Sequence, residues 1–393
     1  MRSGYRRIGD YIKEVKVRNS ELKTEELLGI NIDKFFMPSV ANVIGTDLSV
    51  YKLVKKNQFA CNRMHVGRDY RLPVSMSKSE TEFMVSPAYD VFEILDTEKL
   101  DPEFLMMWFT RREFDRNAWF YTDADVRGGL PWKSFLDMTV PVPSITKQRE
   151  IVKEYNVVQN RITLNQQMIQ KLEETAQAVY KRWFVEEIDL ENLPEGWKAG
   201  TLSDVLNSKG YIRGPFGSAL KVSDMQACGI PVYEQQHAID NHRNFRYFIS
   251  EEKQKLLKRF VVQENDFVVS CSGTLGRITE IEKEDPKGII NQALLILRVN
   301  KSILHPKIFK YFITSPEGNS LLIQDASGSA QVNIAKREQI VIIPLIIPDY
   351  DTQSIIAKQL IAIDYQIKLK SKENHKLSEL KDLLLSKLAT IEN

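Results

Sequence analysis

The chain has 393 residues, 43% of them hydrophobic, and its 54 Lys and Arg residues against 52 Asp and Glu residues give a net charge of +2. Because a domain averages about 150 residues, this length excludes a single small domain and predicts two or three. The near-neutral charge excludes a uniformly basic chain, so any basic surface must be local.

Cellular location and metal content are constrained by three features of the sequence. The segment "MRSGYRRIGDYIKEV" carries charges where a secretory signal needs an apolar core, and no run of about 18 apolar residues suits a membrane span. Cys61, Cys228 and Cys271 lie far apart, as is typical of reduced thiols in a cytosolic protein. No second Cys or His pair completes a metal-ligand spacing. We expect a soluble, cytoplasmic protein with no membrane contact and no metal.

Residues 1–145 are predicted to form an irregular, strand-rich domain. A short amphipathic helix, "DPEFLMMWF", has Pro102 in its first turn, where a missing N–H costs nothing. The apolar run "KSFLDMTVPVP" follows and ends in Pro141 and Pro143, which stop a strand from continuing. The domain therefore ends just before residue 146.

Residues 146–190 are predicted to form a long helix and a linker. Apolar residues recur at alternating steps of four and three, which is the heptad pattern of a coiled coil. A helix with this seam reaches about 50 Å at 1.5 Å per residue, so we interpret it as a spacer. The seam consists of Ile151, Tyr155, Val158, Ile162, Asn165, Ile169, Leu172, Ala176, Val179 and Trp183.

The rest of the chain repeats this plan, with a second domain at 191–350 and a second helix at 351–393. The segment "VKKNQFACNRMHVGR" parallels "VQENDFVVSCSGTLGR", and "DPEFLMMWF" parallels "HPKIFKYFI". Gln148 at the first helix start falls on Gln353 at the second. The second seam consists of Ile356, Leu360, Ile363, Ile367, Lys370, Asn374, Leu377, Lys381, Leu384 and Leu388.

Each long helix is expected to pair with the other. An antiparallel pair around a pseudo-two-fold axis would bring equivalent residues of the polar middle together, Asn165 with Lys370 and Ile169 with Asn374. Buried polar groups at seam positions fix register at some cost in stability. The alternatives are that the helices splay there or that a third protein binds. The predicted fold class is α+β, with two tandem strand-rich domains separated by two long antiparallel coiled-coil helices.

Catalytic motifs are missing. "SPAYD" at 86–90 has Ser86 and Ala88 where the [DN]-P-P-[YF] motif of amino-methyltransferases needs a hydrogen-bond acceptor and a proline. No phosphate-binding loop, nuclease motif or convincing catalytic triad occurs. We therefore expect a non-enzymatic chain that holds no cofactor of its own.

Polar loops of both domains suit DNA. Gly-rich turns let a backbone approach a phosphate, while Arg and Gln side chains can make paired hydrogen bonds to base edges. Each of these residues could instead be an ordinary solvated side chain on a turn. The candidates are Arg63, His65, Arg68, Arg71 and Arg127 in the first domain, and Lys209, Tyr211, Arg213, Gln235, Gln236, His237, Ser272, Thr274, Arg277, Ser329 and Gln331 in the second.

Several motifs together resemble the specificity (S) subunit of type I restriction-modification systems, over essentially the whole chain. These are the duplicated plan, the proline-punctuated run before each Gln-initiated helix, "RWFVEEIDLENLPEGWK" (182–198), "GPFGSALK" (214–221) and "SCSGTLGR" (270–277). The second exit, with Pro344 and Pro348, departs from the family's tighter P-x-P spacing.

The resemblance implies a role in defence against foreign DNA. Each target-recognition domain would read half of a bipartite, asymmetric site in double-stranded DNA, and the helices would set the unread gap. Two methyltransferase (modification) subunits would dock on the helices and domain flanks, and motor-nuclease (restriction) subunits can join. The resemblance also implies adenine methylation by those partners, with S-adenosylmethionine bound there.

Physical reasoning adds detail to this expectation. Two domains reading major grooves on one face of B-DNA sit about 10 bp apart, which leaves a gap of about half a turn. The target bases, one in each half-site, must be flipped out and should lie on opposite strands. Near-neutral charge predicts weak DNA affinity for the chain alone. The competing hypotheses are a helical scaffold that does not read DNA and a self-sufficient DNA-modifying enzyme with an unrecognised site.

Overall fold

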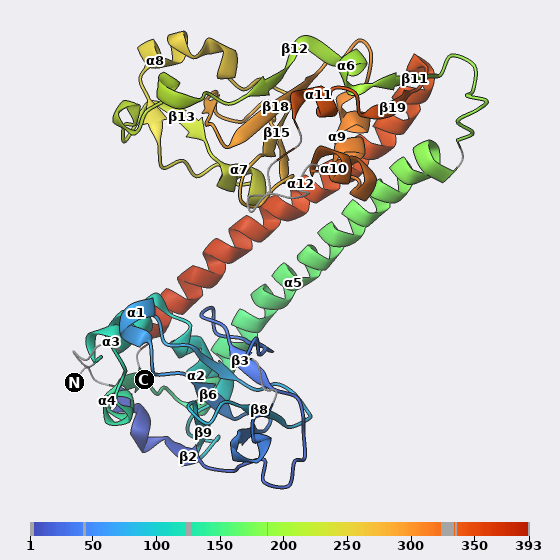
Figure 1. The fold of residues 1–393 in the computed structure, drawn as a ribbon. Coiled ribbons are helices and arrows are strands. Elements are labelled where there is room, and N and C mark those ends of the chain that lie inside the picture. The colour runs from blue at the N-terminus through green and yellow to red at the C-terminus, as the bar shows by residue number, and fades with distance from the viewer. Residues whose placement is uncertain are drawn as a thin grey trace. The chain divides into compact units, whose positions relative to one another are not determined.

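The computed structural model describes residues 4–41, 45–122, 128–186, 188–323, 334 and 336–391 (Figure 1). Two compact units make up the chain. The first unit comprises Met1–Gln166 and Lys372–Asn393, and the second comprises Gln167–Ser371. Each unit thus contains one strand-rich domain and a part of both long helices.

The first unit is built on a four-stranded sheet in the order β2-β9-β6-β7. Its chain enters and leaves along one strand pair, because β1 pairs antiparallel with β10 and Tyr5 lies opposite Pro141. The strands are β1 (Tyr5–Arg7), β2 (Ile12–Val15), β3 (Leu28–Ile30), β4 (Phe36–Pro38), β5 (Lys52–Val54), β6 (Phe59–Cys61), β7 (Val74–Met76), β8 (Phe83–Val85), β9 (Asp90–Ile94) and β10 (Thr139–Pro141). The short helices are α1 (Val66–Asp69), α2 (Pro102–Phe109), α3 (Arg112–Phe120) and α4 (Trp132–Asp137).

The second unit repeats this arrangement, with a four-stranded sheet in the order β12-β18-β15-β16 and an entry-exit pair of β11 and β19. Its strands are β11 (Lys198–Thr201), β12 (Leu206–Arg213), β13 (Ile230–Tyr233), β14 (Phe248–Ile249), β15 (Asp266–Ser270), β16 (Ile278–Glu280), β17 (Ile289–Ile290), β18 (Leu294–Val299) and β19 (Pro344–Ile347). Its short helices are α6 (Leu202–Val205), α7 (Gln235–Ile239), α8 (Glu251–Leu256), α9 (Pro306–Thr314), α10 (Pro316–Ile323) and α11 (Arg337–Ile340).

The duplication is therefore visible in the structure, and the predicted α+β fold is confirmed. The copies also agree at the sheet margin. β8 pairs antiparallel with β5 and bridges Leu27 in parallel through Met84, while β17 pairs parallel with β13 and bridges Val261 antiparallel through Ile289. In both domains this strand therefore has one antiparallel and one parallel neighbour.

Two long helices follow the domains, α5 (Ile145–Lys181) and α12 (Tyr350–Lys387), with 37 and 38 residues. Every predicted seam position on them is buried or half-buried, as the heptad pattern indicates. In the second unit, Ala176 and Tyr180 of α5 share a core with Ile356 and Leu360 of α12. None of the described helices is both long and apolar enough to cross a lipid bilayer.

The helix segments of the first unit run antiparallel. Lys381 Nζ donates to Gln159 Oε1 at 3.1 Å, and Asn165 Nδ2 donates to Asn374 Oδ1 at 3.0 Å. The predicted pairs, Asn165 with Lys370 and Ile169 with Asn374, are therefore wrong in register, because Asn165 has Asn374 as its partner. The physical reason is that a two-fold axis between antiparallel helices exchanges positions on either side of the centre, so equivalent residues meet only at the centre itself.

A buried glutamine at the start of each long helix ties three segments together. Gln148 Nε2 donates to the carbonyls of Pro143 and Lys99 at 2.8 and 2.9 Å, and Gln148 Oε1 accepts from the Asp101 N–H at 2.8 Å. The segments joined are the exit strand, the turn before the proline-initiated helix α2, and α5 itself. We call this arrangement a glutamine clamp.

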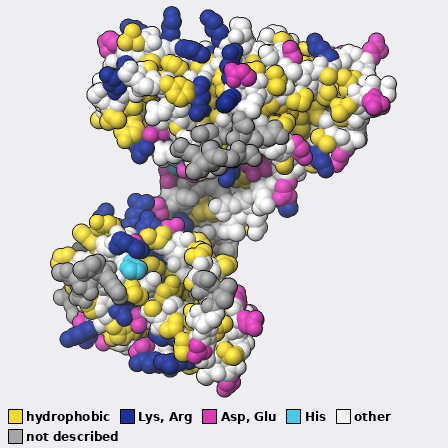
Figure 2. Space-filling model, in the orientation of Figure 1, with side chains coloured by type: hydrophobic (Ala, Val, Ile, Leu, Met, Phe, Trp, Pro, Cys, Tyr) yellow, Lys and Arg dark blue, Asp and Glu magenta, His cyan; other side chains and the backbone are white. Residues whose placement is uncertain are grey.

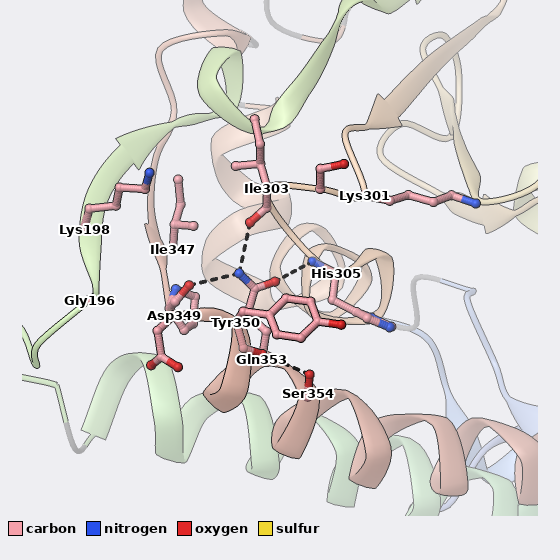
Figure 3. A pocket seen from close by; sticks show the side chains of 12 residues that line it. Gly196, Lys198, Lys301, Ile303, His305, Ile347, Asp349, Tyr350, Gln353 and Ser354 are labelled. Atoms are coloured by element: carbon pink, nitrogen blue, oxygen red, sulfur yellow. Dashed lines mark hydrogen bonds between the residues drawn. The ribbon is translucent and has the colours of Figure 1, made fainter.

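The second domain has the same clamp, drawn in Figure 3. Gln353 Nε2 donates to the carbonyls of Pro348 and Ile303, each at 2.9 Å, and Gln353 Oε1 accepts from the His305 N–H at 2.7 Å. The equivalence of all three contacts shows that the wider proline spacing of the second exit leaves the clamp geometry unchanged.

Replacing Gln148 with Leu should weaken the first unit. The change leaves two carbonyls and one N–H without their partners, and we expect the free energy of unfolding to fall by about 2–3 kcal/mol. Hydrogen exchange of the α2 amides measures the effect. Gln166→Leu, at an exposed glutamine of the same helix, is the control and should leave exchange unchanged. Equal exchange in both variants would contradict a structural role for the clamp.

The Asn165–Asn374 pair provides a second test. Asn165→Leu alone should lower the free energy of unfolding by about 1–2 kcal/mol, because it leaves Asn374 Oδ1 without its donor in the seam. Changing both residues to Leu should recover that loss, since an apolar seam needs no polar partner. Urea unfolding of the three proteins measures this. If the double variant is the least stable of the three, the pairing is wrong.

Candidate nucleic-acid interface

Charged side chains occur in several groups on both units, with Asp and Glu side chains between the Lys and Arg side chains (Figure 2). This distribution agrees with the net charge of +2. Any attraction to DNA must therefore come from individual loops, which we consider one domain at a time.

The first candidate loop joins β6 to β7 and contains α1. Arg63 begins the loop but points into the domain. Its Nε donates to Asp90 Oδ2 at 2.6 Å, its Nη1 donates to the Leu130 carbonyl, and its guanidinium lies 5.3 Å from the centre of the Trp132 ring. With a side chain only 21% exposed, Arg63 anchors the loop.

Other cations of this loop reach solvent. The Arg68 side chain is 67% exposed and makes two hydrogen bonds to Asp69, at 2.6 and 3.0 Å. Arg71 is also exposed and contacts Asp33 at 2.6 Å. His65 is half-buried just before α1. Asp69 and Asp33 each hold the guanidinium beside them in one orientation and reduce the net positive charge of the loop surface.

A buried ion pair that no sequence pattern indicates supports this loop. Lys34 Nζ lies 2.7 Å from Asp115 Oδ1, which also accepts the Leu72 N–H at 3.0 Å. Burial lowers the pKa of Lys34, and the nearby Asp115 carboxylate opposes this shift. No sequence periodicity connects a lysine in the β3–β4 turn with an aspartate on α3, so no local signal could have revealed the pair.

Exposed aromatic side chains, likewise not indicated by a sequence pattern, lie beside the same loop. The Tyr70 and Trp119 ring centres are 5.3 Å apart, and the neighbouring Phe120 is 77% exposed. Tyr70 ends α1 with a positive φ of 55°. The predicted contact residue Arg127 falls in the segment after α3 that lies outside the described residues.

In the second domain, β12 carries three of the predicted contacts. Lys209 is exposed, whereas Tyr211 and Arg213 are half-buried. Burial raises the pKa of Tyr211. The Arg213 guanidinium lies 5.8 Å from the Phe216 ring centre, and its Nη1 is buried without a hydrogen-bond partner among the described residues.

The β15–β16 loop is the equivalent of the β6–β7 loop, and its backbone is firmly held. Gly273 and Gly276 adopt positive φ angles of 62° and 67°, which favour glycine. Ser270 Oγ accepts from the Arg277 N–H at 2.9 Å and donates to the Thr274 carbonyl at 2.6 Å. Thr274 and Arg277 are exposed.

Gln235 contacts this loop from α7. Its Nε2 donates to the Ser272 carbonyl and, at 3.3 Å, to the Thr274 carbonyl. The structure thus brings Gln235, Ser272 and Thr274 together, with the amide of Gln235 engaged by the loop backbone. Gln236 is half-buried beside it.

His237 is fully buried and serves the fold. Its Nδ1 accepts from the Glu234 N–H at 2.8 Å, so its Nε2 carries the proton and donates to the Asn244 carbonyl at 3.0 Å. Burial lowers the pKa of His237. Its side chain presents no surface to solvent. The remaining candidates, Ser329 and Gln331, lie outside the described residues.

A small-molecule pocket and a metal site are two other kinds of binding site that a protein can present. A polar cavity of about 300 Å³ lies at the Gln353 clamp, lined by Lys198, Lys301 and His305 among others (Figure 3). Over the described part of the chain, no three His, Cys, Asp or Glu side chains are grouped to hold a metal ion. What the loops offer chemically is hydrogen bonding and positive charge.

Known proteins resemble this chain in sequence, some over part of it and some over nearly all of it. The family described as "Type I restriction modification DNA specificity domain" matches residues 194–379. A protein assigned as the type I restriction enzyme MjaX specificity subunit of Methanocaldococcus jannaschii is 20% identical, over 98% of this chain and 92% of its own length. The type I restriction enzyme HindI specificity subunit of Haemophilus influenzae is 27% identical, over 44% of this chain and 36% of its own.

A solved structure extends the likeness to the fold. The crystal structure of a type I restriction-modification system S subunit from M. genitalium aligns with a TM-score of 0.57 and 14% identity, covering 98% of this chain and 95% of that one. The sequence family, the curated relatives and this fold agree with the resemblance carried by the sequence motifs. Residues 194–379 match the type I restriction modification DNA specificity domain, and the chain as a whole is similar in fold to a solved type I specificity subunit.

Proposed function

We propose that the chain is a type I specificity subunit and that each of its domains reads one half of a bipartite, asymmetric DNA site through the major groove. The observation that carries the proposal is the pair of equivalent loops. The β6–β7 loop exposes Arg68 and Arg71, and the β15–β16 loop exposes Thr274 and Arg277. Arg68 and Arg277 are equivalent in the aligned segments, whereas Arg71 and Thr274 have no counterpart of the same type. One scaffold that presents a shared arginine beside different hydrogen-bonding side chains suits two different half-site sequences.

The second loop is well prepared for this role. Two positive-φ glycines, the Ser270 hydroxyl and the Gln235 amide fix its backbone before any DNA binds. A rigid loop loses little conformational entropy on binding, so more of the contact energy is available to distinguish bases. Gln235, Arg63 and His237 act in this proposal as supports of the reading loops.

The long helices set the unread gap between the half-sites. Their buried seam gives them a defined pairing, and the Asn165–Asn374 hydrogen bond selects one register. A gap of about half a helical turn follows if both domains read major grooves on one face of the DNA.

Two methyltransferase subunits dock on the helices, and motor-nuclease subunits can join them. Ile361, Tyr365 and Leu369 form an exposed apolar stripe along α12, with steps of four residues. Such a stripe on the exposed side of a helix, away from its buried seam, suits a protein partner. The partners bind S-adenosylmethionine and methylate adenine in cytoplasmic DNA, while this chain supplies the sequence specificity.

Arg277→Ala should relax one half of the recognition sequence. Loss of a paired contact to a base removes about 1–3 kcal/mol of discrimination. Methylation sequencing of DNA from cells that express the complex reads both halves of the motif. Arg68→Ala should relax the other half, and the exposed Arg259→Ala, outside the loop, should relax neither. A motif that stays the same in all three variants would count against reading by these loops.

The apolar stripe makes a separate prediction. Tyr365→Glu with Leu369→Glu should weaken binding of the methyltransferase subunit at least about tenfold, because charges replace contacts that a partner buries. Calorimetry with the purified subunits measures the affinity. Gln359→Glu, at an exposed polar position of the same helix, should bind normally. S-adenosylmethionine should bind to the methyltransferase subunit and not to this chain. Tight binding by the double variant would place the partner elsewhere.

A further inference from the structure

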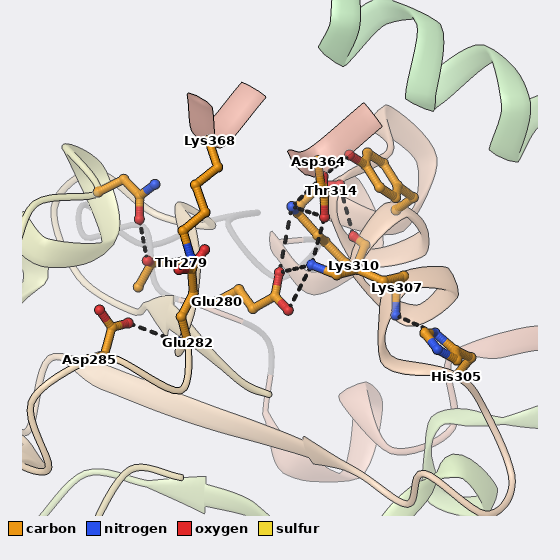
Figure 4. Close-up of polar contacts among 12 residues, drawn as sticks. Thr279, Glu280, Glu282, Asp285, His305, Lys307, Lys310, Thr314, Asp364 and Lys368 are labelled. Carbon is orange, nitrogen blue, oxygen red and sulfur yellow. Dashed lines mark hydrogen bonds and ion pairs between the residues drawn. The ribbon is translucent and has the colours of Figure 1, made fainter. Parts of the chain in front are cut away.

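Four charged side chains meet where the second domain contacts α12 (Figure 4). Lys307 Nζ lies 2.8 Å from Glu280 Oε2 and 2.6 Å from Asp364 Oδ2. Lys310 Nζ lies 2.9 Å from Asp364 Oδ1 and 3.6 Å from Glu280 Oε2. We call these four residues the ionic clamp.

The ionic clamp is well shielded from water, and its charges balance. The Glu280 and Asp364 side chains are 13% and 12% exposed. Burial alone would raise the pKa of Asp364, but the Lys310 and Lys307 ammonium groups outweigh it and hold this pKa below its usual value. Tyr311 adds a hydrogen bond from its hydroxyl to Asp364. The contacts among the four side chains hold them in fixed directions.

In the first domain, the equivalent proline-initiated helix contacts the neighbouring long helix without a four-residue ionic cluster among the described residues. When the two proline-initiated helices are aligned at Pro102 and Pro306, Lys307 falls on Glu103 and Lys310 falls on Met106. Glu103 bonds to Asn156 of α5 and lies 2.9 Å from Lys78. The fold thus does not require the ionic clamp, which is a property of the second domain.

Buried ion pairs stabilise little compared with apolar packing, but they are strongly directional. A rotation or slide of a domain on a helix separates oppositely charged groups from several partners at once, whereas apolar side chains can repack. The ionic clamp therefore resists small changes in the angle between the domain and α12 more than it contributes to stability.

The connection to the reading loop is direct. Glu280 ends β16, three residues after Arg277, and the loop that precedes β16 is the proposed reading loop. One helical turn beyond Asp364, Lys368 contacts Glu282 and lies 3.4 Å from Glu284, which forms a second ionic contact. The strand that positions Arg277 is thus tied to the spacer helix at two successive turns.

We propose that the ionic clamp holds the second domain at one angle on α12 and thereby restricts the protein to a single gap length between the DNA half-sites. This inference rests on the proposed function, because it assigns a positioning role within bipartite DNA reading. Glu280, Lys307, Lys310 and Asp364 touch no base in this proposal. They decide where the reading loop lies.

The test uses Asp364→Leu combined with Lys310→Met. This pair removes one charge of each sign, leaves the Lys307–Glu280 contact in place, and copies the methionine of the first domain. A DNA library carries the wild-type half-sites with gaps of different length, and the assembled methyltransferase complex is assayed for methylation of each. We expect gaps one base pair longer or shorter to gain at least about fivefold relative to the preferred gap, with unchanged half-site sequences.

Lys171→Met with Glu174→Leu is the matched control, since it removes an exposed ion pair of α5 in the same unit. It should keep the wild-type gap profile. A clamp variant that assembles and still accepts only the wild-type gap would overturn the inference. If that variant does not assemble, the milder Asp364→Asn gives the decisive profile. If the wild-type complex shows no bipartite motif, the proposed function itself fails, which is a different outcome from an unchanged profile.

Discussion

The glutamine clamp is the interaction on which each domain depends. A glutamine amide offers two donors and an acceptor at the end of a flexible chain, so one residue can satisfy three backbone groups on separate segments. Gln148 and Gln353 do this at the first turn of each long helix. The clamp joins the exit strand, the turn before the proline-initiated helix and the long helix. Apolar packing is not directional, and it could not fix these three segments so specifically.

The two domains combine a shared frame with different local chemistry. The entry-exit strand pair, the four-stranded sheet and the glutamine clamp recur in both. The proposed reading loops and the contacts to the long helices differ. In the first domain, acidic partners accompany the exposed arginines Arg68 and Arg71. In the proposed function, partial neutralisation would reduce general attraction to phosphates and keep a guanidinium geometry suited to a base.

The parts of this fold that could be predicted from sequence are those with a regular period or a repeated segment. The heptad pattern predicts both long helices, and the internal repeat predicts the second domain. The helix starts at Ile145 and Tyr350 fall within a residue of those expected, while the domain boundaries themselves stay predictions. The short strands, many of only three residues, leave too little pattern to locate.

The exposure of the candidate residues could not be predicted, because a polar residue in a turn looks the same in sequence whether it faces solvent or the interior. Arg63 finds Asp90 and the Leu130 carbonyl, which are distant in the chain. His237 and Gln235 are likewise engaged by neighbouring backbone. By contrast, Arg68, Arg71, Thr274 and Arg277 remain exposed. Tertiary contacts decide between the two outcomes, and sequence spacing does not encode them.

The first unit is completed by the last residues of the chain. Leu385 and Leu388 of the C-terminal helix end belong to its core, and the Tyr5 hydroxyl donates to the Ala389 carbonyl at 3.0 Å. During synthesis, Gln167–Ser371 must be made before these residues appear. At 5–20 residues per second, the ribosome needs roughly 10–40 s for that segment. During this time the part of the first domain's core that Leu385 and Leu388 cover stays exposed on the nascent chain. Exposed apolar surface of this kind is what chaperones bind.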